Sequence, residues 1–143
     1  MHQVMMKVEP ITEVPDFGEN IEVTELLWDF DKLKVSVYCP ESKVDYDVLF
    51  NNEFGPSSVR LLDESDLSEN WDSFNLRHGW LYKVVSGGWF DQESDREGFL
   101  MQHSAQLVKE YLIIGLDACV SVITKENVIV VNKAGTQLVE VRT

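Results

Sequence analysis

The feature that most constrains the fold of this chain is the concentration of apolar residues between positions 110 and 132, with the sequence EYLIIGLDACVSVITKENVIVVN. Three runs within it, 111–114, 118–123 and 128–131, consist mostly of β-branched or aliphatic residues, and short breaks separate them. Apolar runs of this length and composition, bounded by turn residues, are typical of buried strands. We therefore predict that they form the central strands of one sheet and belong to the core instead of a functional site.

A second pattern, the alternation of apolar and polar residues, runs through residues 22–30, 32–38 and 44–50. A period of two predicts strands with one buried and one solvated face. The break between Asp29 and Lys32 is short enough for a hairpin. We expect these segments to form an antiparallel meander in which the acidic side chains of residues 44–50 face outward.

Two other segments have helical features. In residues 63–74, the side chains of Leu67, Trp71 and Phe74 are spaced by four and three positions, which places them on one face of a helix. Acidic residues at the start of this segment suit the positive end of a helix dipole. Residues 93–107 are a second predicted helix, although a glycine within them costs about 1 kcal/mol relative to alanine.

Taken together, these elements predict an α+β protein with one mixed, mostly antiparallel β-sheet and one or two helices packed on a face. We expect residues 1–143 to form a single domain, because a chain of 143 residues buries enough surface for a core without disulfides. Residues 1–20 contain Pro10, Pro15 and Gly18, and we expect them to form an extended N-terminal arm.

The cysteines and the apolar segments bear on the compartment. Cys39 and Cys119 both stand among strand-like apolar residues, so we expect two buried thiols in a reducing compartment, with a disulfide as the alternative. Residues 1–14 lack the apolar stretch of a signal peptide, and no run approaches the ~20 apolar residues of a membrane span. We therefore expect a soluble, cytoplasmic protein.

Motifs of catalysis and cofactor binding are scarce in this sequence. His2, His78 and His103 stand in unrelated contexts, without the paired spacing of a metal site. The Gly87-Gly88 pair is not followed by the residues of a phosphate-binding loop. Paired carboxylates could act as general acid and base or bind Mg²⁺. Acids are dense throughout residues 1–97, however, so such pairs are better explained as ordinary solvated side chains. We therefore expect no metal, no cofactor and no catalytic residue.

Charge distribution indicates the kind of partner. The net charge is −13, and residues 1–97 contain 21 acidic against 8 basic residues, whereas residues 98–143 contain 4 of each. The negative electrostatic field of these residues repels nucleic acid and anionic membranes, and it attracts a basic protein. The alternative is that the acidic residues serve solubility alone.

The most acidic segments flank a cluster of tryptophans, Trp71, Trp80 and Trp89. Protein interfaces favour aromatic anchors with charged residues at the rim. The spacing of Trp71 and Trp80 places both side chains on the buried side of their predicted elements, so they are better explained as core residues. Trp89 fits either role. The predicted partner-binding residues are Asp63, Glu64, Asp66, Glu69, Asp72, Trp89, Asp91, Glu93 and Asp95.

The stretches VRLLDESDL, GGWFDQESDREGF and EYLIIGLDACVSV, in a short and strongly acidic chain without catalytic motifs, give it a profile that resembles the immunity proteins of bacterial toxin systems. The resemblance is one of overall profile, and no subfamily is assigned. It implies tight 1:1 binding to a cognate toxin domain, often a basic nuclease whose active site the acidic residues would cover.

Two alternatives to an inhibitor stay open. The first is a small enzyme or ligand-binding domain with a pocket near Trp80, Gly88 and Trp89. The second is a subunit of a larger assembly, in which the acidic residues keep the protein soluble. A deep pocket with a desolvated carboxylate would favour the first alternative, and a large exposed apolar patch would favour the second.

Overall fold

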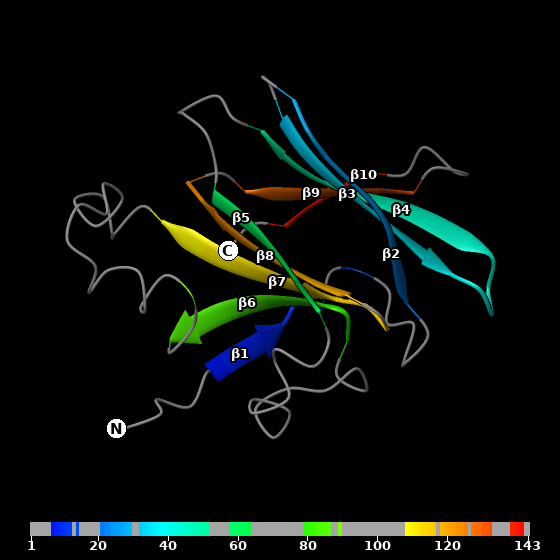
Figure 1. Ribbon diagram of the computed structural model, residues 1–143, viewed down its shortest axis with the longest axis horizontal. Coiled ribbons are helices and arrows are strands. Elements are labelled where there is room, and N and C mark those ends of the chain that lie inside the picture. The colour runs from blue at the N-terminus through cyan, green and yellow to red at the C-terminus, as the bar shows by residue number, and fades with distance from the viewer. Residues whose placement is uncertain are drawn as a thin grey trace.

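The computed structural model of the chain describes residues 7–12, 14, 21–29, 32–51, 58–63, 79–86, 89, 108–116, 118–125, 127–132 and 138–141. Ten strands in these residues form two antiparallel sheets of five strands each (Figure 1). Sheet A has the order β1 (Lys7–Pro10), β6 (Leu81–Ser86), β7 (Lys109–Ile114), β8 (Ala118–Thr124) and β5 (Ser58–Asp63). Sheet B has the order β10 (Leu138–Val141), β9 (Val128–Asn132), β4 (Val44–Asn51), β3 (Lys32–Cys39) and β2 (Glu22–Trp28).

The two sheets pack face to face as a β-sandwich, so the predicted α+β fold with helices on one face is wrong. Every element of the described residues is a strand. The prediction assumed a single sheet whose apolar face needed helices to cover it, but a second sheet covers that face here. Asp63, predicted to begin a helix, is the last residue of β5. Residues 64–74 and 93–107, predicted as helical, lie outside the described residues.

The three apolar runs are strands, as predicted, but they do not share one sheet. β7 and β8 are neighbours in sheet A, whereas β9 lies between β4 and β10 in sheet B. The chain therefore passes from one sheet to the other between β8 and β9. The prediction was wrong on this point because the apolar pattern of a strand does not record which strand it pairs with.

The predicted meander is confirmed as β2, β3 and β4. The hairpin between β2 and β3 is closed by a hydrogen bond from the backbone N–H of Asp29 to the carbonyl oxygen of Lys32, with an N···O distance of 2.9 Å. At the turn between β3 and β4, Lys43 adopts a positive φ of 56° and its N–H donates to the carbonyl oxygen of Cys39. This turn brings β4 back beside β3, so that β4 can pair on its other side with β9.

The main core lies between the sheets and draws on both. It includes Leu33, Val35, Val37, Val48 and Phe50 from sheet B and Leu81, Tyr111, Ile113, Val120 and Val122 from sheet A. The rings of Phe50 and Tyr111 lie 5.7 Å apart between centroids, and those of Tyr46 and Trp80 lie 6.3 Å apart. These contacts join the two sheets into one core.

Sheet A also buries side chains on its second face. Tyr82, Val84, Leu112, Ile114 and Cys119 form a separate buried cluster there. The centre of this sheet is therefore buried on both sides, which explains why the sequences of β7 and β8 are almost continuously apolar.

Other sequence predictions concern the cysteines and the first residues. Cys39 and Cys119 are both free and buried, as expected. Within residues 1–20, Lys7–Pro10 form β1, which pairs with β6 at the edge of sheet A.

In the part of the chain that the structure describes, no helix has the length and apolar character needed to cross a membrane.

Candidate functional site

Of the nine residues predicted to bind a partner, two lie in the described part of the chain. Asp63 is the last residue of β5, and Trp89 is partly buried. The other seven, Glu64, Asp66, Glu69, Asp72, Asp91, Glu93 and Asp95, lie outside the described residues. The proposal that these nine residues form one surface therefore stays a prediction.

Trp89 is held against the second face of sheet A. Its backbone N–H donates to Oε2 of Glu110 at 3.0 Å, and the Glu110 side chain is on the same side of β7 as Leu112. The guanidinium carbon of Arg60, on β5, lies 4.9 Å from the centroid of the Trp89 ring, within the range of a cation–π contact. The indole therefore has an intramolecular partner.

Trp80 lies elsewhere. It is fully buried in the core between the sheets, as predicted from its period, and its ring is near that of Tyr46. The two tryptophans are thus on opposite faces of sheet A, and this arrangement does not support a single pocket lined by both. Gly88, the third residue of that predicted pocket, is outside the described residues.

The outer face of sheet B offers a better candidate site. Because Leu33, Val35 and Val37 point into the core, the alternating side chains of Lys34 and Ser36 point outward. The register of the sheet extends this face over its neighbouring strands. Its members, which we call the acidic face, are Glu22, Glu25, Leu27, Lys34, Ser36, Tyr38, Asp45, Asp47, Leu49, Ile129 and Val131.

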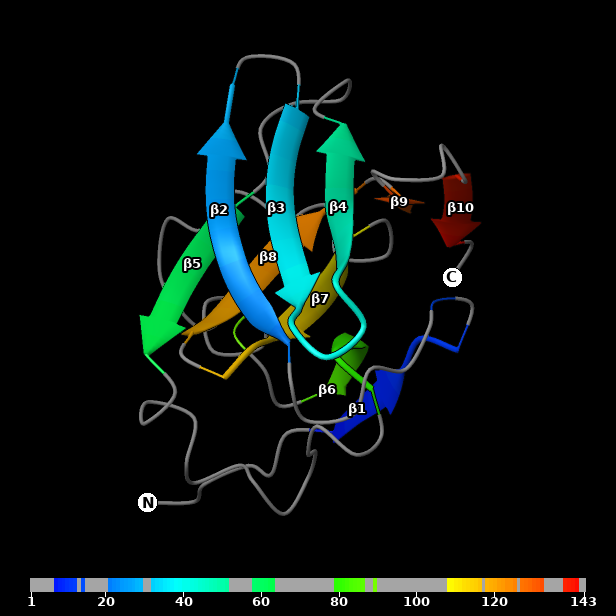
Figure 2. The same ribbon diagram turned by 90° about the vertical axis from the view of Figure 1, so that its right-hand side faces the viewer.

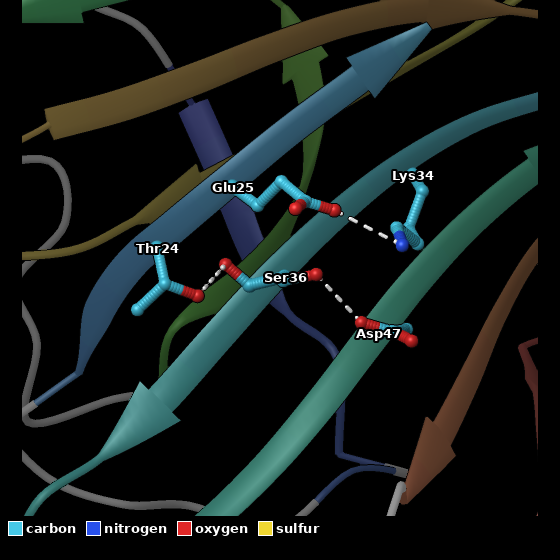
Figure 3. A network of polar contacts seen from close by, with 5 residues as sticks. All are labelled: Thr24, Glu25, Lys34, Ser36 and Asp47. Atoms are coloured by element: carbon cyan, nitrogen blue, oxygen red, sulfur yellow. Dashed lines mark hydrogen bonds and ion pairs between the residues drawn. The ribbon is translucent and has the colours of Figure 1, made fainter. Parts of the chain in front are cut away.

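Figure 2 looks at the acidic face directly, with sheet A behind it, and no other described strand lies in front of β2, β3 and β4. The face nevertheless has an ordered polar centre (Figure 3). The hydroxyl of Ser36 donates to Oδ1 of Asp47 at 2.7 Å, and Nζ of Lys34 lies 3.0 Å from Oε1 of Glu25. Both contacts link neighbouring strands, so they hold the carboxylates in fixed positions.

A β-bulge in β2 adds to this network. The register of β2 on β3 shifts between Val23 and Glu25, which leaves Thr24 as the extra residue. The hydroxyl of Thr24 donates to the carbonyl oxygen of Ser36 at 3.2 Å. This hydrogen bond crosses from β2 to β3 where the ladder is disrupted, and it ties the bulged strand to the centre of the sheet.

The electrostatics of the acidic face are negative. Its members include four acids, Glu22, Glu25, Asp45 and Asp47, against one lysine, Lys34. The hydrogen bond from Lys34 to Glu25 raises the pKa of this lysine above its ordinary value of 10.5. Desolvation opposes this shift, and the charges of Glu25, Asp47 and Asp29 add to it. Several carboxylates therefore act on a single cation.

Exposed apolar side chains adjoin these charges. Leu27 is 45% exposed and lies on the acidic face beside Lys34, at the edge of sheet B. Trp28, also in β2, is 56% exposed, but it pairs with Leu33 and therefore lies on the opposite side of the strand. An exposed aromatic residue next to charged groups is typical of protein-binding surfaces. β2 thus presents acids and Leu27 on the acidic face and an exposed tryptophan on its other side.

Sequence reasoning correctly predicted that the acids of β4 face outward, but it did not select them as a site. It selected the segments in which acids are densest. Glu22 and Glu25 are three residues apart and share a face only because of the bulge at Thr24. The signal that identifies Asp45 and Asp47 is different, because these acids recur with a period of two in one strand of the meander. Such a pattern gathers charge on one face of a sheet.

Within the described residues, no group of three or more His, Cys, Asp or Glu side chains is arranged to hold a metal ion. Comparisons with protein-family models, curated proteins and solved structures gave no match for the chain.

Proposed function

We propose that this protein is a non-catalytic binding module that neutralises a basic protein partner, and that it uses the acidic face of sheet B for this purpose. The observation that carries the proposal is the array of outward carboxylates on β2, β3 and β4 beside the exposed side chain of Leu27. In the form that the sequence profile resembles, the protein is a cytoplasmic bacterial immunity protein and the partner is a toxin domain.

The fixed geometry of the acidic face suits this role. Asp47 is held by Ser36 and Glu25 by Lys34, so a partner meets carboxylates that are already ordered. Preorganised charges lose less side-chain entropy on binding than freely rotating ones. Fields of one sign also speed the encounter with an oppositely charged protein and make the association sensitive to salt.

A nucleic acid or an anionic membrane is disfavoured as the partner of this face. Both present closely spaced phosphates, and each contact with Glu22, Asp45 or Asp47 would add repulsion where binding requires the release of counterions. A basic protein presents lysine and arginine side chains instead, and these can pair with the same carboxylates.

The first test is a pull-down with the tagged protein from a lysate of its source organism, washed at low and then at high salt, with mass spectrometric identification. We expect one basic protein that is lost as the salt concentration rises. The purified candidate is then titrated by calorimetry. Recovery of no basic protein by a well-folded bait would contradict the proposal.

A pair of charge variants locates the contact. We expect Asp45→Lys to slow association with the captured partner severalfold more than a reversal elsewhere at low salt, because it reverses a charge of the acidic face. The matched control is Glu9→Lys on β1, an exposed acid at the edge of the other sheet. Equal effects of the two changes would show that net charge alone matters and would exclude the acidic face as the contact surface.

A further inference from the structure

β2 is an edge strand with an unusual combination of features. It ends the strand order of sheet B, and among the described residues only β3 pairs with it. β5 ends the order of sheet A, and both views show it on the same side of the sandwich as β2 (Figures 1 and 2). Three of the four exposed large apolar residues of the described chain, Leu27, Trp28 and Leu61, belong to these two strands.

The main chain of β2 has groups that point away from β3. The hydrogen bond from Asp29 to Lys32 fixes the register of the ladder at the hairpin. In an antiparallel pair, hydrogen-bonded and non-hydrogen-bonded positions alternate. The N–H and C=O groups of Leu26 and Trp28 are therefore directed toward the outer edge, where an additional strand could pair with them.

The edge lacks some of the usual protection against pairing. Natural edge strands often carry lysine, proline or a bulge. The bulge of β2 lies at Thr24, and the segment from Glu25 to Trp28 beyond it is in regular register. Residues 21–29 contain neither lysine nor proline. The part of β2 nearest the hairpin is thus a regular strand edge with exposed apolar side chains.

We propose that an extended segment of the basic partner adds to β2 as a further strand of sheet B. The segment carries lysine or arginine on the side next to Glu22 and Glu25, and apolar residues on the side next to Leu26 and Trp28. This inference rests on the proposed function for the charge of the partner, and it adds the mode of recognition. Main-chain hydrogen bonds supply affinity in such pairing, and alternate side chains supply specificity.

Charge complementarity favours this occupant over a second copy of the chain. The described residues 21–29 contain three acids, Glu22, Glu25 and Asp29, and no basic residue. Pairing β2 with itself would place these acids near their own copies, and like charges on paired strands are destabilising. A basic extended segment replaces that repulsion with cross-strand ion pairs.

The probe is a synthetic nine-residue peptide of alternating lysine and valine, blocked at both ends, which presents lysines on one side of a strand and valines on the other. We expect saturable binding to the ¹⁵N-labelled protein, followed by NMR, with the amide protons of Leu26 and Trp28 becoming protected from hydrogen exchange. Two control peptides are used. One has glutamate in place of lysine, and the other is methylated on alternate backbone nitrogens and keeps its charge.

A matched pair of variants tests the role of the backbone. Trp28→Pro and Trp28→Ala both remove the indole, but only proline removes the outward N–H, which the ladder with β3 does not use. We expect the peptide to bind Trp28→Pro about tenfold more weakly than Trp28→Ala, because one main-chain hydrogen bond is lost. If Trp28→Pro does not fold, the N-methylated peptide gives the same comparison on the unaltered protein.

Strand addition is supported if the lysine–valine peptide protects Leu26 and Trp28 and the N-methylated peptide does not. It is overturned if both peptides bind equally, because binding is then electrostatic only. Concentration-dependent dimerisation through β2 would overturn it in favour of a second copy. The proposed function would stay intact, and this inference would be overturned, if the peptide does not pair with β2 but a basic protein is captured and its binding requires Asp45. Protection of Leu26 and Trp28 without any captured basic protein would support edge pairing while the proposed function fails.

Discussion

The two sheets of this protein differ in how many of their faces are buried. At the centre of sheet A, Ile113 points into the core between the sheets and Leu112 into the buried cluster on the opposite face. At the centre of sheet B, Val35 points into the same core, whereas Lys34 lies on a face with charged and partly exposed side chains. The same architecture therefore serves two purposes: sheet A is mainly core, and sheet B can offer a binding surface.

This difference explains where charge is tolerated. A carboxylate on the outer face of sheet B keeps part of its hydration and finds neighbours such as Ser36 and Lys34. Sheet A also has a buried carboxylate, Glu110, but this group accepts a hydrogen bond from the backbone N–H of Trp89. A charge in the apolar cluster around Leu112 would lose its hydration without such a partner, which is strongly unfavourable. The acidic character of the chain can thus gather on one sheet without loss of the core.

The largest expected effect comes from placing a lysine on the face of each sheet that points away from the core between the sheets. Leu112→Lys puts an ammonium where the leucine is 1% exposed, and we expect it to reduce the free energy of unfolding by about 4 kcal/mol or more. Leu49→Lys puts it on the acidic face, where the leucine is partly exposed, and we expect a change below about 1 kcal/mol. Urea denaturation measures both. Similar losses would contradict the proposed difference between the sheets.

A smaller effect is expected at Gly115, where the end of β7 lies against β2. A Cβ on Gly115, after β7, would lie 3.0 Å from Cγ2 of Val23, 3.1 Å from the backbone nitrogen of Val23 and 3.2 Å from the carbonyl oxygen of Ala118. We expect Gly115→Ala to cost about 1–3 kcal/mol by overpacking, measured by thermal denaturation. Adding Val23→Ala should relieve only the side-chain contact. Full recovery in that double variant would show that the main-chain contacts are unimportant.

The hydrogen bond between Ser36 and Asp47 should contribute less. Ser36→Ala removes the donor and leaves a partly buried carboxylate with one partner fewer, so we expect a loss of about 1–2 kcal/mol in the free energy of unfolding. In the Asp47→Asn background the acceptor is neutral, and the same change should cost less. A double-mutant cycle in urea gives the coupling. A coupling of zero would mean that the pair does not order the acidic face.

The smallest effect concerns the titration of Lys34. Its pKa is raised above 10.5, first by the hydrogen bond to Glu25, so the ion pair stabilises the fold fully below about pH 10.5 and this contribution is lost as the pH rises through the higher folded value. The chemical shift of the lysine ¹³Cε against pH measures the midpoint. We expect Glu25→Gln to move it down toward 10.5. An unchanged midpoint would show that Glu25 is not the main cause.

Much of the secondary structure followed from local patterns. The alternation in residues 32–38 predicted which side chains of β3 face the core, and the continuous apolar runs predicted β7, β8 and β9. The outward direction of Asp45 and Asp47 was also predictable from alternation alone. These predictions succeed because a strand's side chains alternate with a fixed period of two, whatever the strand packs against.

The candidate site was predictable only in part. The sequence indicated an acidic protein and a basic partner, but it ranked acids by their local density. The acidic face instead joins Glu22 and Glu25 with Asp45 and Asp47, which are separated along the chain and meet through the pairing of β2, β3 and β4. The exposure of Trp28 could not be predicted, because it depends on the position of β2 at the edge of its sheet.

The sequence by itself determined where β2, β3, β4, β7, β8 and β9 lie and which side chains of β3 and β4 share a face. Only the tertiary structure decided that β8 and β9 belong to different sheets, that a sheet instead of helices covers the core, and that β2 is left at an edge. The physical reason is that hydrophobic burial has no direction, so an apolar face is satisfied equally by a helix or by a second sheet. The choice depends on contacts between distant residues, such as Tyr46 and Asn132, which no local pattern contains.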